Sequence, residues 1–138
     1  MILVVTGSRY FQNHIRVTRM LNKIKKQSEL VDPTTKMTVI MGDCPTGADK
    51  IALDWAIGQD GDVRYDVFKA QWDLYGKMAG PARNRNMVLF AKRLSEQSPT
   101  IPIYCVGFLK KGAKNAGTLN CLKEAENVGI QTAKYWGE

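Results

Sequence analysis

Three loops with the composition of phosphate-binding segments follow apolar runs in this sequence. The first is Thr6-Gly7-Ser8-Arg9, in which glycine lets the backbone approach an anion while hydroxyl and guanidinium groups can donate to phosphate oxygens. The second is Gly42-Asp43-Cys44-Pro45-Thr46-Gly47, and the third covers residues 110–118 and ends in Gly117 and Thr118 at a predicted helix start. Each loop also has the composition of an ordinary turn, so none identifies a phosphate site alone.

The second loop carries the best candidate for a catalytic carboxylate, Asp49, in the first turn of the helix predicted to follow it. Asp49 could contact a ribose hydroxyl or a base, or it could serve only as a partner of the helix macrodipole. We expect Gly42, Asp43 and Gly47 to contact the same ligand. Cys44 is an alternative nucleophile, but the sequence shows no basic partner for a thiol mechanism.

A fourth segment, residues 71–84, combines aromatic residues, glycines and fixed charges in a long predicted loop. Trp72 could stack on a nucleobase, or it could pack in the core. Arg83 and Asn84 stand at the start of a helix predicted from Pro81, where they could bind phosphate or ribose.

Strand and helix patterns alternate along the whole chain and predict how these segments are positioned. Strands are expected over residues 2–6, 37–41, 63–67, 101–108 and 130–133, the third with one face covered. Amphipathic helices are expected from Asn13, from Ala48 to a stop at Gly58 or Gly61, from Pro81, and over residues 119–127 with Gly129 as cap. The pattern predicts an α/β fold, a single Rossmann-like domain over residues 1–138 with a mostly parallel, doubly wound sheet and helices on both faces. Ligands bind beyond the carboxyl ends of the strands in such sheets, so we expect the four segments to form one pocket.

The composition limits which ligands and partners are expected for this protein. A net charge of +7 suits phosphate ligands or nucleic acid and does not decide between them. Three cysteines without CxxC spacing and one histidine predict no metal site and no disulfide, and no cofactor is expected. The apolar run after Met1 is interpreted as a strand and not as a signal peptide, so a cytoplasmic protein with no membrane partner is expected. A homo-oligomer, most simply a dimer, is compatible with the sequence.

The order of the motifs resembles one family. The chain contains T-G-S-R, then G-D-C-P-T-G-A-D, then W-D-x-Y-G-K-x-A-G-P-x-R-N-x-x-M, then A-G-T. This series resembles the YspA/YpsA-related branch of the SLOG superfamily, which includes the DNA-processing protein DprA and the LOG nucleotide phosphoribohydrolases. The resemblance runs from about Ile2 to Ile130 and implies a Rossmann-like fold with a pocket for nucleotides or their derivatives, in proteins often found beside stress, phage or conflict systems. Carried over by position, it assigns to the pocket Gly7, Ser8, Arg9, Gly47, Asp49, Arg83, Asn84, Gly117 and Thr118.

One departure from the LOG hydrolases bears on activity. Their P-G-G-x-G-T-x-x-E block carries a glutamate used in cleaving the N-glycosidic bond, whereas Cys121 stands at that position here and Glu124 follows one turn later. The first hypothesis is therefore a protein that senses or binds a nucleotide or nucleotide-derived small molecule. The second is a nucleotide N-glycosidase, and the third is a protein that binds single-stranded nucleic acid.

Overall fold

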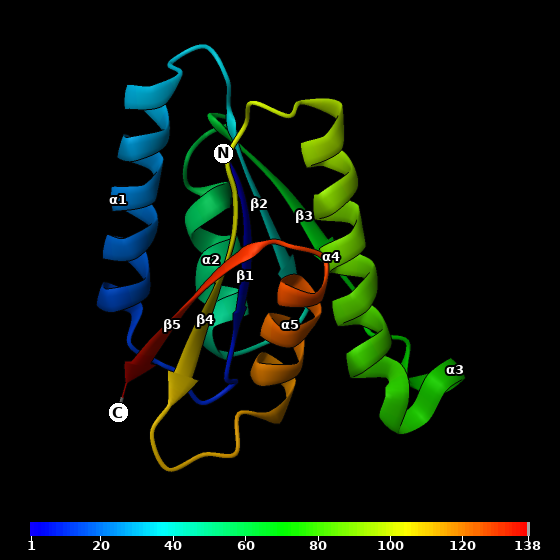
Figure 1. Cartoon of the computed structure of the whole chain (residues 1–138). Helices are drawn as coiled ribbons and strands as arrows, with labels where there is room; N and C mark the ends of the chain where they lie inside the picture. The colour runs from blue at the N-terminus through cyan, green and yellow to red at the C-terminus, as the bar shows by residue number, and fades with distance from the viewer. Residues whose placement is uncertain (138) are drawn as a thin grey trace.

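Five parallel strands form one sheet, whose order is β3-β2-β1-β4-β5 in a computed structural model that describes residues 1–137. The strands are β1 (Ile2–Gly7), β2 (Met37–Gly42), β3 (Val63–Phe68), β4 (Ile103–Lys110) and β5 (Gln131–Gly137). Every neighbouring pair is parallel, and the strand order reverses beside β1 (Figure 1). The predicted doubly wound α/β fold is confirmed.

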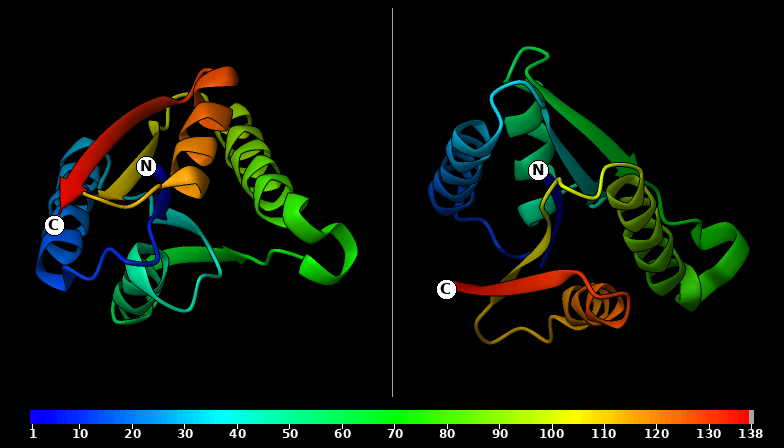
Figure 2. Two further views of the ribbon diagram at one scale, coloured as in Figure 1. Left: turned by 90° about the horizontal axis from the view of Figure 1, so that it is seen from below. Right: turned by 45° about the horizontal axis from the view of Figure 1, so that its top comes forward.

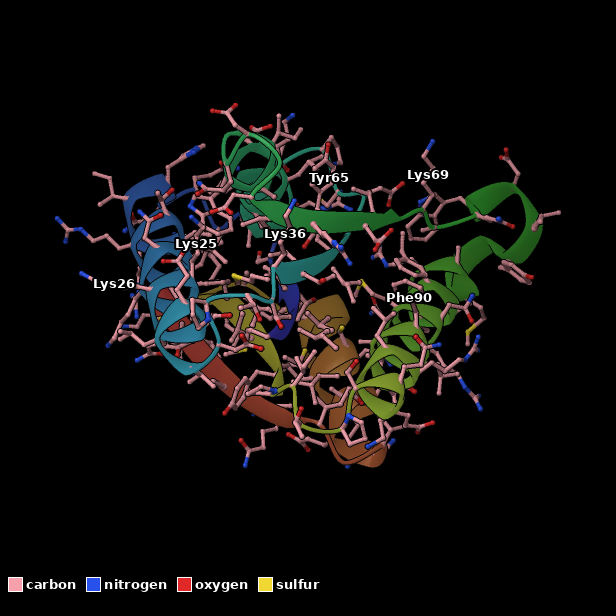
Figure 3. The ribbon with its side chains drawn as sticks, turned by 90° about the horizontal axis from the view of Figure 1, so that it is seen from above. Lys25, Lys26, Lys36, Tyr65, Lys69 and Phe90 are labelled. Carbon is pink, nitrogen blue, oxygen red and sulfur yellow. The ribbon has the colours of Figure 1, made fainter. Side chains whose placement is uncertain are left out.

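Helices cover both faces of the sheet, as predicted. They are α1 (His14–Val31), α2 (Gly47–Ile57), α3 (Trp72–Tyr75), the 3-10 helix η1 (Gly76–Met78), α4 (Ala79–Gln97) and α5 (Ala116–Asn127). Helices α1 and α2 pack on one face, and α4 and α5 pack on the other (Figures 2 and 3). None of the helices within residues 1–137 combines the length and the apolar character that crossing a membrane requires.

The first strand is apolar throughout because both of its faces are buried. Leu3 and Val5 belong to the core on the α1–α2 side, and Ile2 and Val4 belong to the core on the α4–α5 side. A central strand of a parallel sheet therefore shows a continuous apolar run and no alternation. This run places Gly7 at the carboxyl end of the central strand, beside the point where the strand order reverses.

One prediction about the edge strand β3 is wrong, namely that one of its faces is covered. The alternation of Val63, Tyr65 and Val67 identifies a strand, but the expected covered face is covered only at Val63. Tyr65 is 44% exposed because β3 is the last strand of the sheet and only β2 pairs with it.

Helix boundaries differ from the predictions near two of the four candidate segments. The long predicted loop over residues 71–84 contains α3 and η1, and α4 begins at Ala79, two residues before Pro81. Proline is tolerated there because the first turn of a helix has no hydrogen bond for its missing N–H. Helix α5 begins at Ala116, about one turn earlier than expected, and it ends with Gly129 in the left-handed conformation that a glycine cap favours.

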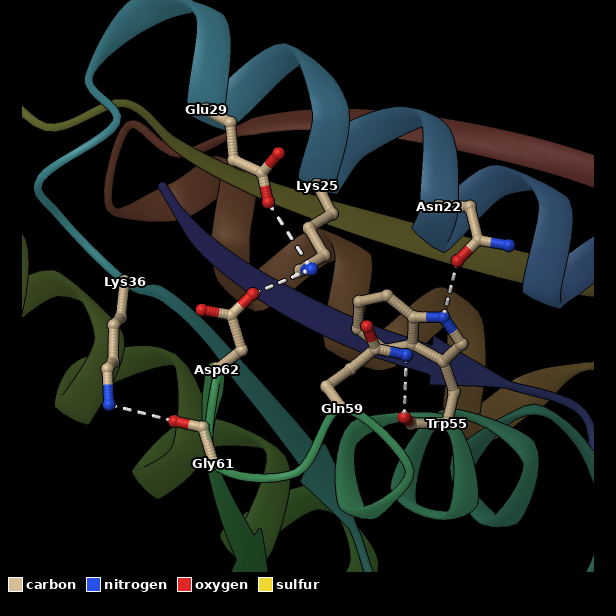
Figure 4. Close-up of polar contacts among 8 residues, drawn as sticks. All are labelled: Asn22, Lys25, Glu29, Lys36, Trp55, Gln59, Gly61 and Asp62. Atoms are coloured by element: carbon tan, nitrogen blue, oxygen red, sulfur yellow. Dashed lines mark hydrogen bonds and ion pairs between the residues drawn. The ribbon is translucent and has the colours of Figure 1, made fainter.

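Two ends of the sheet are distinguished below. The amino edge is where the strands begin, at Ile2, Met37, Val63, Ile103 and Gln131, and the carboxyl edge is where they end, at Gly7, Gly42, Phe68, Lys110 and Gly137. Near the amino edge, Lys25 Nζ of α1 lies 2.8 Å from Asp62 Oδ2, and Trp55 Nε1 of α2 donates to Asn22 Oδ1 over 2.8 Å (Figure 4). These contacts join α1 to α2 and to the turn before β3.

Candidate functional site

A cleft of about 1080 Å³ lies at the carboxyl edge, bounded by the loops after β1, β2 and β4 and by the start of α4. The expected convergence of the four segments is therefore present in the structure. All the predicted site residues except Gly47 line this cleft: Gly7, Ser8, Arg9, Gly42, Asp43, Asp49, Trp72, Arg83, Asn84, Gly117 and Thr118.

Gly47 is the exception, and its role is structural. It has a φ of +78°, and a Cβ on it would overlap the carbonyl oxygen of Ser8 and lie 2.7 Å from Arg9 Cα. Glycine is needed because the start of α2 packs directly on the loop after β1. Thr46 reinforces this contact by donating its hydroxyl to the Arg9 carbonyl over 3.0 Å. Gly47 thus holds two walls of the cleft together, and the expectation that it contacts the ligand stays a prediction.

A chain of polar contacts crosses the cleft from the β2 loop to α5. Arg83 Nη1 lies 3.0 Å from Asp43 Oδ1, and Arg83 Nε donates to Asn84 Oδ1 over 2.9 Å. The Asn84 side-chain amide in turn donates to the Gly117 carbonyl and to Asn120 Oδ1, over 3.1 and 3.0 Å. Arg83 and Asn84 are therefore fixed in place, and both line the cleft.

Asp49 lies under this chain, against Gly42. A Cβ on Gly42 would be 2.5 Å from Arg83 Nη1 and 2.8 Å from Asp49 Oδ2, so glycine leaves the space that both side chains occupy. Asp49 is only 6% exposed, and its Oδ1 has no hydrogen-bond partner within residues 1–137. An unpaired oxygen on a buried carboxyl group is rare, because losing water without gaining a partner is unfavourable.

Burial changes the acidity of Asp49. Removal of the carboxyl group from water raises its pKa from 3.8 to about 7, although the positive charge of Arg83 and a hydrogen bond from the Cys44 backbone act in the opposite direction. The nearby Asp43 carboxylate raises this pKa further. The favourable effect of the α2 N-terminus on a carboxylate is thus outweighed by desolvation. Asp49 can hold or release a proton near neutral pH.

The first turn of α5 faces the cleft without a capping side chain. Ala116, Gly117 and Thr118 line the cleft, and the N-cap residue Asn115 makes no side-chain cap. The Asn115 side chain instead pairs with the backbone of Lys110, accepting and donating over 2.9 Å in each case. The N–H groups that begin a helix favour anions when no side chain occupies them, so this turn has the properties of an anion site.

Basic residues line the cleft in addition to the predicted site residues. Lys77, Lys110, Lys111 and Lys114 line the cleft together with Arg9 and Arg83, against two carboxylates, Asp43 and Asp49. Within the described part of the chain, Arg83 is the only one of these basic side chains that forms an ion pair. The lysine-rich composition of residues 110–114 was the available signal for three of them, and Lys77 stood in a quoted motif without an assigned role, whereas nothing in the sequence marked Asn120 on α5.

The residues that line the cleft give less support to a thiol mechanism, to catalysis by Glu124 or to a metal site. Cys44 lines the cleft, but His14 does not, so the structure gives its thiol no imidazole base. Cys121 points into the core, and neither it nor Glu124 lines the cleft. Within residues 1–137, no cluster of three or more histidine, cysteine, aspartate or glutamate side chains has an arrangement that could hold a metal ion.

Comparison with known proteins finds a family and a phage protein to which this sequence is similar. The family described as YAcAr, the YspA, cpYpsA-related SLOG family, matches residues 1–75, more than half of the chain. The Gene 61 protein of Mycobacterium phage D29 is 29% identical over 136 residues, which cover 96% of this chain and 94% of that protein. No solved structure matches. The family match includes the loops after β1 and β2 and ends with the last residue of α3, before Arg83, Asn84 and the α5 turn.

Proposed function

The chain belongs to the YspA, cpYpsA-related SLOG family, and from this premise we propose that it binds a nucleotide or a nucleotide-derived small molecule in the carboxyl-edge cleft. The phosphate lies at the first turn of α5, within reach of Arg9 and the lysines of residues 110–114. The observation that carries the proposal is the uncapped α5 turn opening on the same cleft as these unpaired basic side chains. Helix N–H groups and cations together favour a dianionic phosphate over a neutral ligand.

Arg83 is the second point of attachment for the ligand. Its guanidinium is held by Asp43 and by Asn84, which leaves it oriented before the ligand enters. Such fixed groups lose little conformational entropy on binding. The two carboxylates of the lining disfavour an anion, but Asp43 is neutralised by Arg83 and Asp49 is partly protonated near pH 7.

A second candidate function is hydrolysis of the N-glycosidic bond, and Asp49 is the observation that favours it. In this reaction water adds across the bond between the ribose C1′ and the base nitrogen, releasing free base and a ribose phosphate. A carboxyl group that titrates near neutrality could accept the water proton, and the carboxylate could stabilise positive charge on the ribose. Asp49 has the required pKa, and no glutamate stands among the described lining residues.

The first experiment is a thermal-shift screen with nucleoside mono-, di- and triphosphates, ADP-ribose, NAD and cyclic dinucleotides. A ligand at 100 times its Kd stabilises the folded state by about 2.7 kcal/mol, which gives a clear rise in Tm. Chromatography of the same mixtures separates binding from turnover, because only hydrolysis releases free base. Absence of a shift with every compound would contradict the proposal. Tighter binding of a single-stranded oligonucleotide than of any mononucleotide, with a steep salt dependence, would indicate a nucleic-acid site instead.

Arg83→Gln tests the position of the site. This variant should weaken binding of the best compound by about 10-fold or more, because a charge-assisted hydrogen bond to phosphate is lost. Arg93→Gln is the matched control, since Arg93 lies on the same helix, is exposed and does not line the cleft. Equal effects of the two substitutions would place the ligand elsewhere.

Asp49→Asn separates the two candidate functions. Loss of base release with retained binding would support the hydrolase, because an amide cannot accept the water proton. Retained binding with no base release from the wild-type protein would support the binding function. Loss of binding and of activity to the same extent would assign Asp49 to the structure of the cleft.

A further inference from the structure

The cleft has two chemically different ends. The loops after β1 and β4 and the first turn of α5 supply hydroxyl groups, backbone N–H groups and unpaired basic side chains. The other end is formed by α3, η1 and the start of α4, where Trp72, Gly80 and Pro81 line the cleft beside Lys77. Phosphate recognition accounts for the basic side chains and leaves the apolar surface of Trp72 unexplained.

Trp72 is held as a platform at this second end. The indole is 56% exposed although it lines the cleft, so a large apolar surface faces solvent. A Cβ on Gly80 would lie 3.6 Å from Cη2 of Trp72, which places the indole against the bare backbone of the first α4 turn. The ring is therefore supported on one side and open on another. The core-packing alternative for Trp72 is excluded.

Among the exposed apolar side chains of α3 and η1, only Trp72 lines the cleft. Helix α3 and η1 project from the body of the molecule (Figures 1 and 2), and three further apolar side chains on this segment are exposed, Leu74, Tyr75 and Met78. None of these three lines the cleft. Exposure of the segment thus does not by itself explain why the indole faces the site.

The other aromatic side chain of the cleft belongs to the phosphate end. Tyr10 follows Arg9 directly, and its backbone N–H donates to the Ser8 hydroxyl over 3.1 Å within the loop after β1. Trp72 belongs to α3, and this helix lies across the carboxyl edge from the loop after β1 (Figure 2). A ligand with phosphate at α5 and a planar ring at Trp72 would span both ends.

We propose that Trp72 forms a base-binding subsite, so that the ligand carries a nucleobase stacked on the indole in addition to its phosphate. This inference rests on the proposed function and adds the part of the ligand that the basic end does not recognise. Base–aromatic stacking accepts every base, because each base has a π-face, so the subsite selects for the presence of a base and only weakly for its identity.

The test compares AMP with ribose 5-phosphate, which has the same sugar and phosphate but no base. The wild-type protein should bind AMP more tightly, and Trp72→Leu should weaken AMP binding by about 5- to 100-fold while changing ribose 5-phosphate binding less than about 2-fold. Trp72→Phe should retain AMP affinity within about 3-fold, because a phenyl ring still stacks. Isothermal titration calorimetry measures the affinities, and AMP should quench indole emission in the wild type but not in Trp72→Phe.

Tyr75→Leu is the matched control, because Tyr75 is 55% exposed on the same short helix and does not line the cleft. It should leave both affinities unchanged. Equal binding of AMP and ribose 5-phosphate by the wild type, or equal weakening of both by Trp72→Leu, would overturn the subsite and leave the phosphate site intact. Failure of the wild type to bind AMP or any other compound of the thermal-shift screen would overturn the proposed function, and the subsite with it.

Discussion

The amino edge and the carboxyl edge of the sheet differ in whether their basic side chains have partners within the protein. At the amino edge, Lys25 pairs with Asp62, and Lys36 Nζ donates to the Gly61 carbonyl over 2.8 Å (Figure 4). At the carboxyl edge, the lysines of residues 110–114 have no carboxylate partner within the described chain, and the α5 turn has no side-chain cap. These amino-edge lysines are paired, whereas the carboxyl edge keeps the lysines of residues 110–114 and the N–H groups of the α5 turn available beside the paired Arg83.

The pKa values of two aspartates, one from each edge, are shifted in opposite directions. Asp32, in the turn before β2, accepts hydrogen bonds from the Thr34 and Thr35 hydroxyls, and these lower its pKa to about 2. Asp49 at the carboxyl edge is buried with one oxygen unpaired, and its pKa rises to about 7. Ionisation of Asp32 stabilises the fold, and ionisation of Asp49 opposes it. A retained unfavourable group is typical of functional sites, where local stability is given up for chemistry or binding.

The largest expected effect separates the glycines of the two edges. Gly47→Ala should lower the free energy of unfolding by about 3 to 5 kcal/mol, because the methyl group combines left-handed backbone strain with overlap of the Ser8 carbonyl. Gly61→Ala at the amino edge is the control: its φ is +86° but a Cβ would have no neighbour within 4 Å, so only about 1 to 2 kcal/mol should be lost. Urea unfolding measures both, and similar losses would contradict the close packing of the β1 and β2 loops.

A smaller effect, with opposite pH dependence at the two edges, is expected for the aspartates. The raised pKa of Asp49 means that the unfolded chain releases this proton near pH 4 and the folded chain near pH 7. Stability is therefore lost as pH rises between these values, up to a limit of about 4 kcal/mol. Asp49→Asn should be more stable than the wild type at pH 8, and the difference should vanish near pH 4. The difference between the two proteins isolates Asp49 from the other titrating groups.

Asp32→Asn should behave in the reverse manner. The lowered pKa of Asp32 contributes stability that is present above pH 4 and is lost as pH falls towards 2. This variant should therefore be less stable than the wild type at pH 7, with a difference that shrinks as pH is lowered from 4 towards 3. Denaturant unfolding at a series of pH values measures both aspartate variants. If the stability differences of the two variants from the wild type changed with pH in the same direction, the two edges would not differ in their effect on aspartate acidity.

The smallest effects on stability and affinity are expected when one lysine at each edge is replaced by methionine. Lys25→Met removes a partly exposed ion pair and should lower stability by no more than about 1 kcal/mol, with unchanged ligand affinity. Lys114→Met at the cleft removes an unpaired charge, so stability should change by less than about 0.5 kcal/mol while AMP affinity falls by about 2- to 10-fold. Thermal unfolding and calorimetry measure the two quantities. An equal loss of affinity in both variants would mean that only the total charge of the protein matters.

Much of the fold followed from patterns within a few residues of each other. The apolar run of β1 and the helical spacing of Val17, Leu21 and Ile24 predicted the elements that the structure contains. Helix starts were less predictable: α5 begins at Ala116 because Asn115 adopts the left-handed conformation and holds the preceding loop, a contact without a periodic signal. The extent to which β3 is covered was missed because an edge strand and an inner strand can share the same alternation.

The sequence by itself determined the α/β architecture and the four segments that line the cleft at the carboxyl edge. These depend on short-range periodicity and on the geometry common to all parallel sheets. Only the tertiary structure decided that Gly47 holds two loops together, that Trp72 faces the cleft, and that Asp49 is buried with a pKa near 7. The reason is physical: Arg83 meets Asp43 across 40 positions of sequence, and Asn84 meets Gly117 across 33. Desolvation and pairing are set by such distant neighbours.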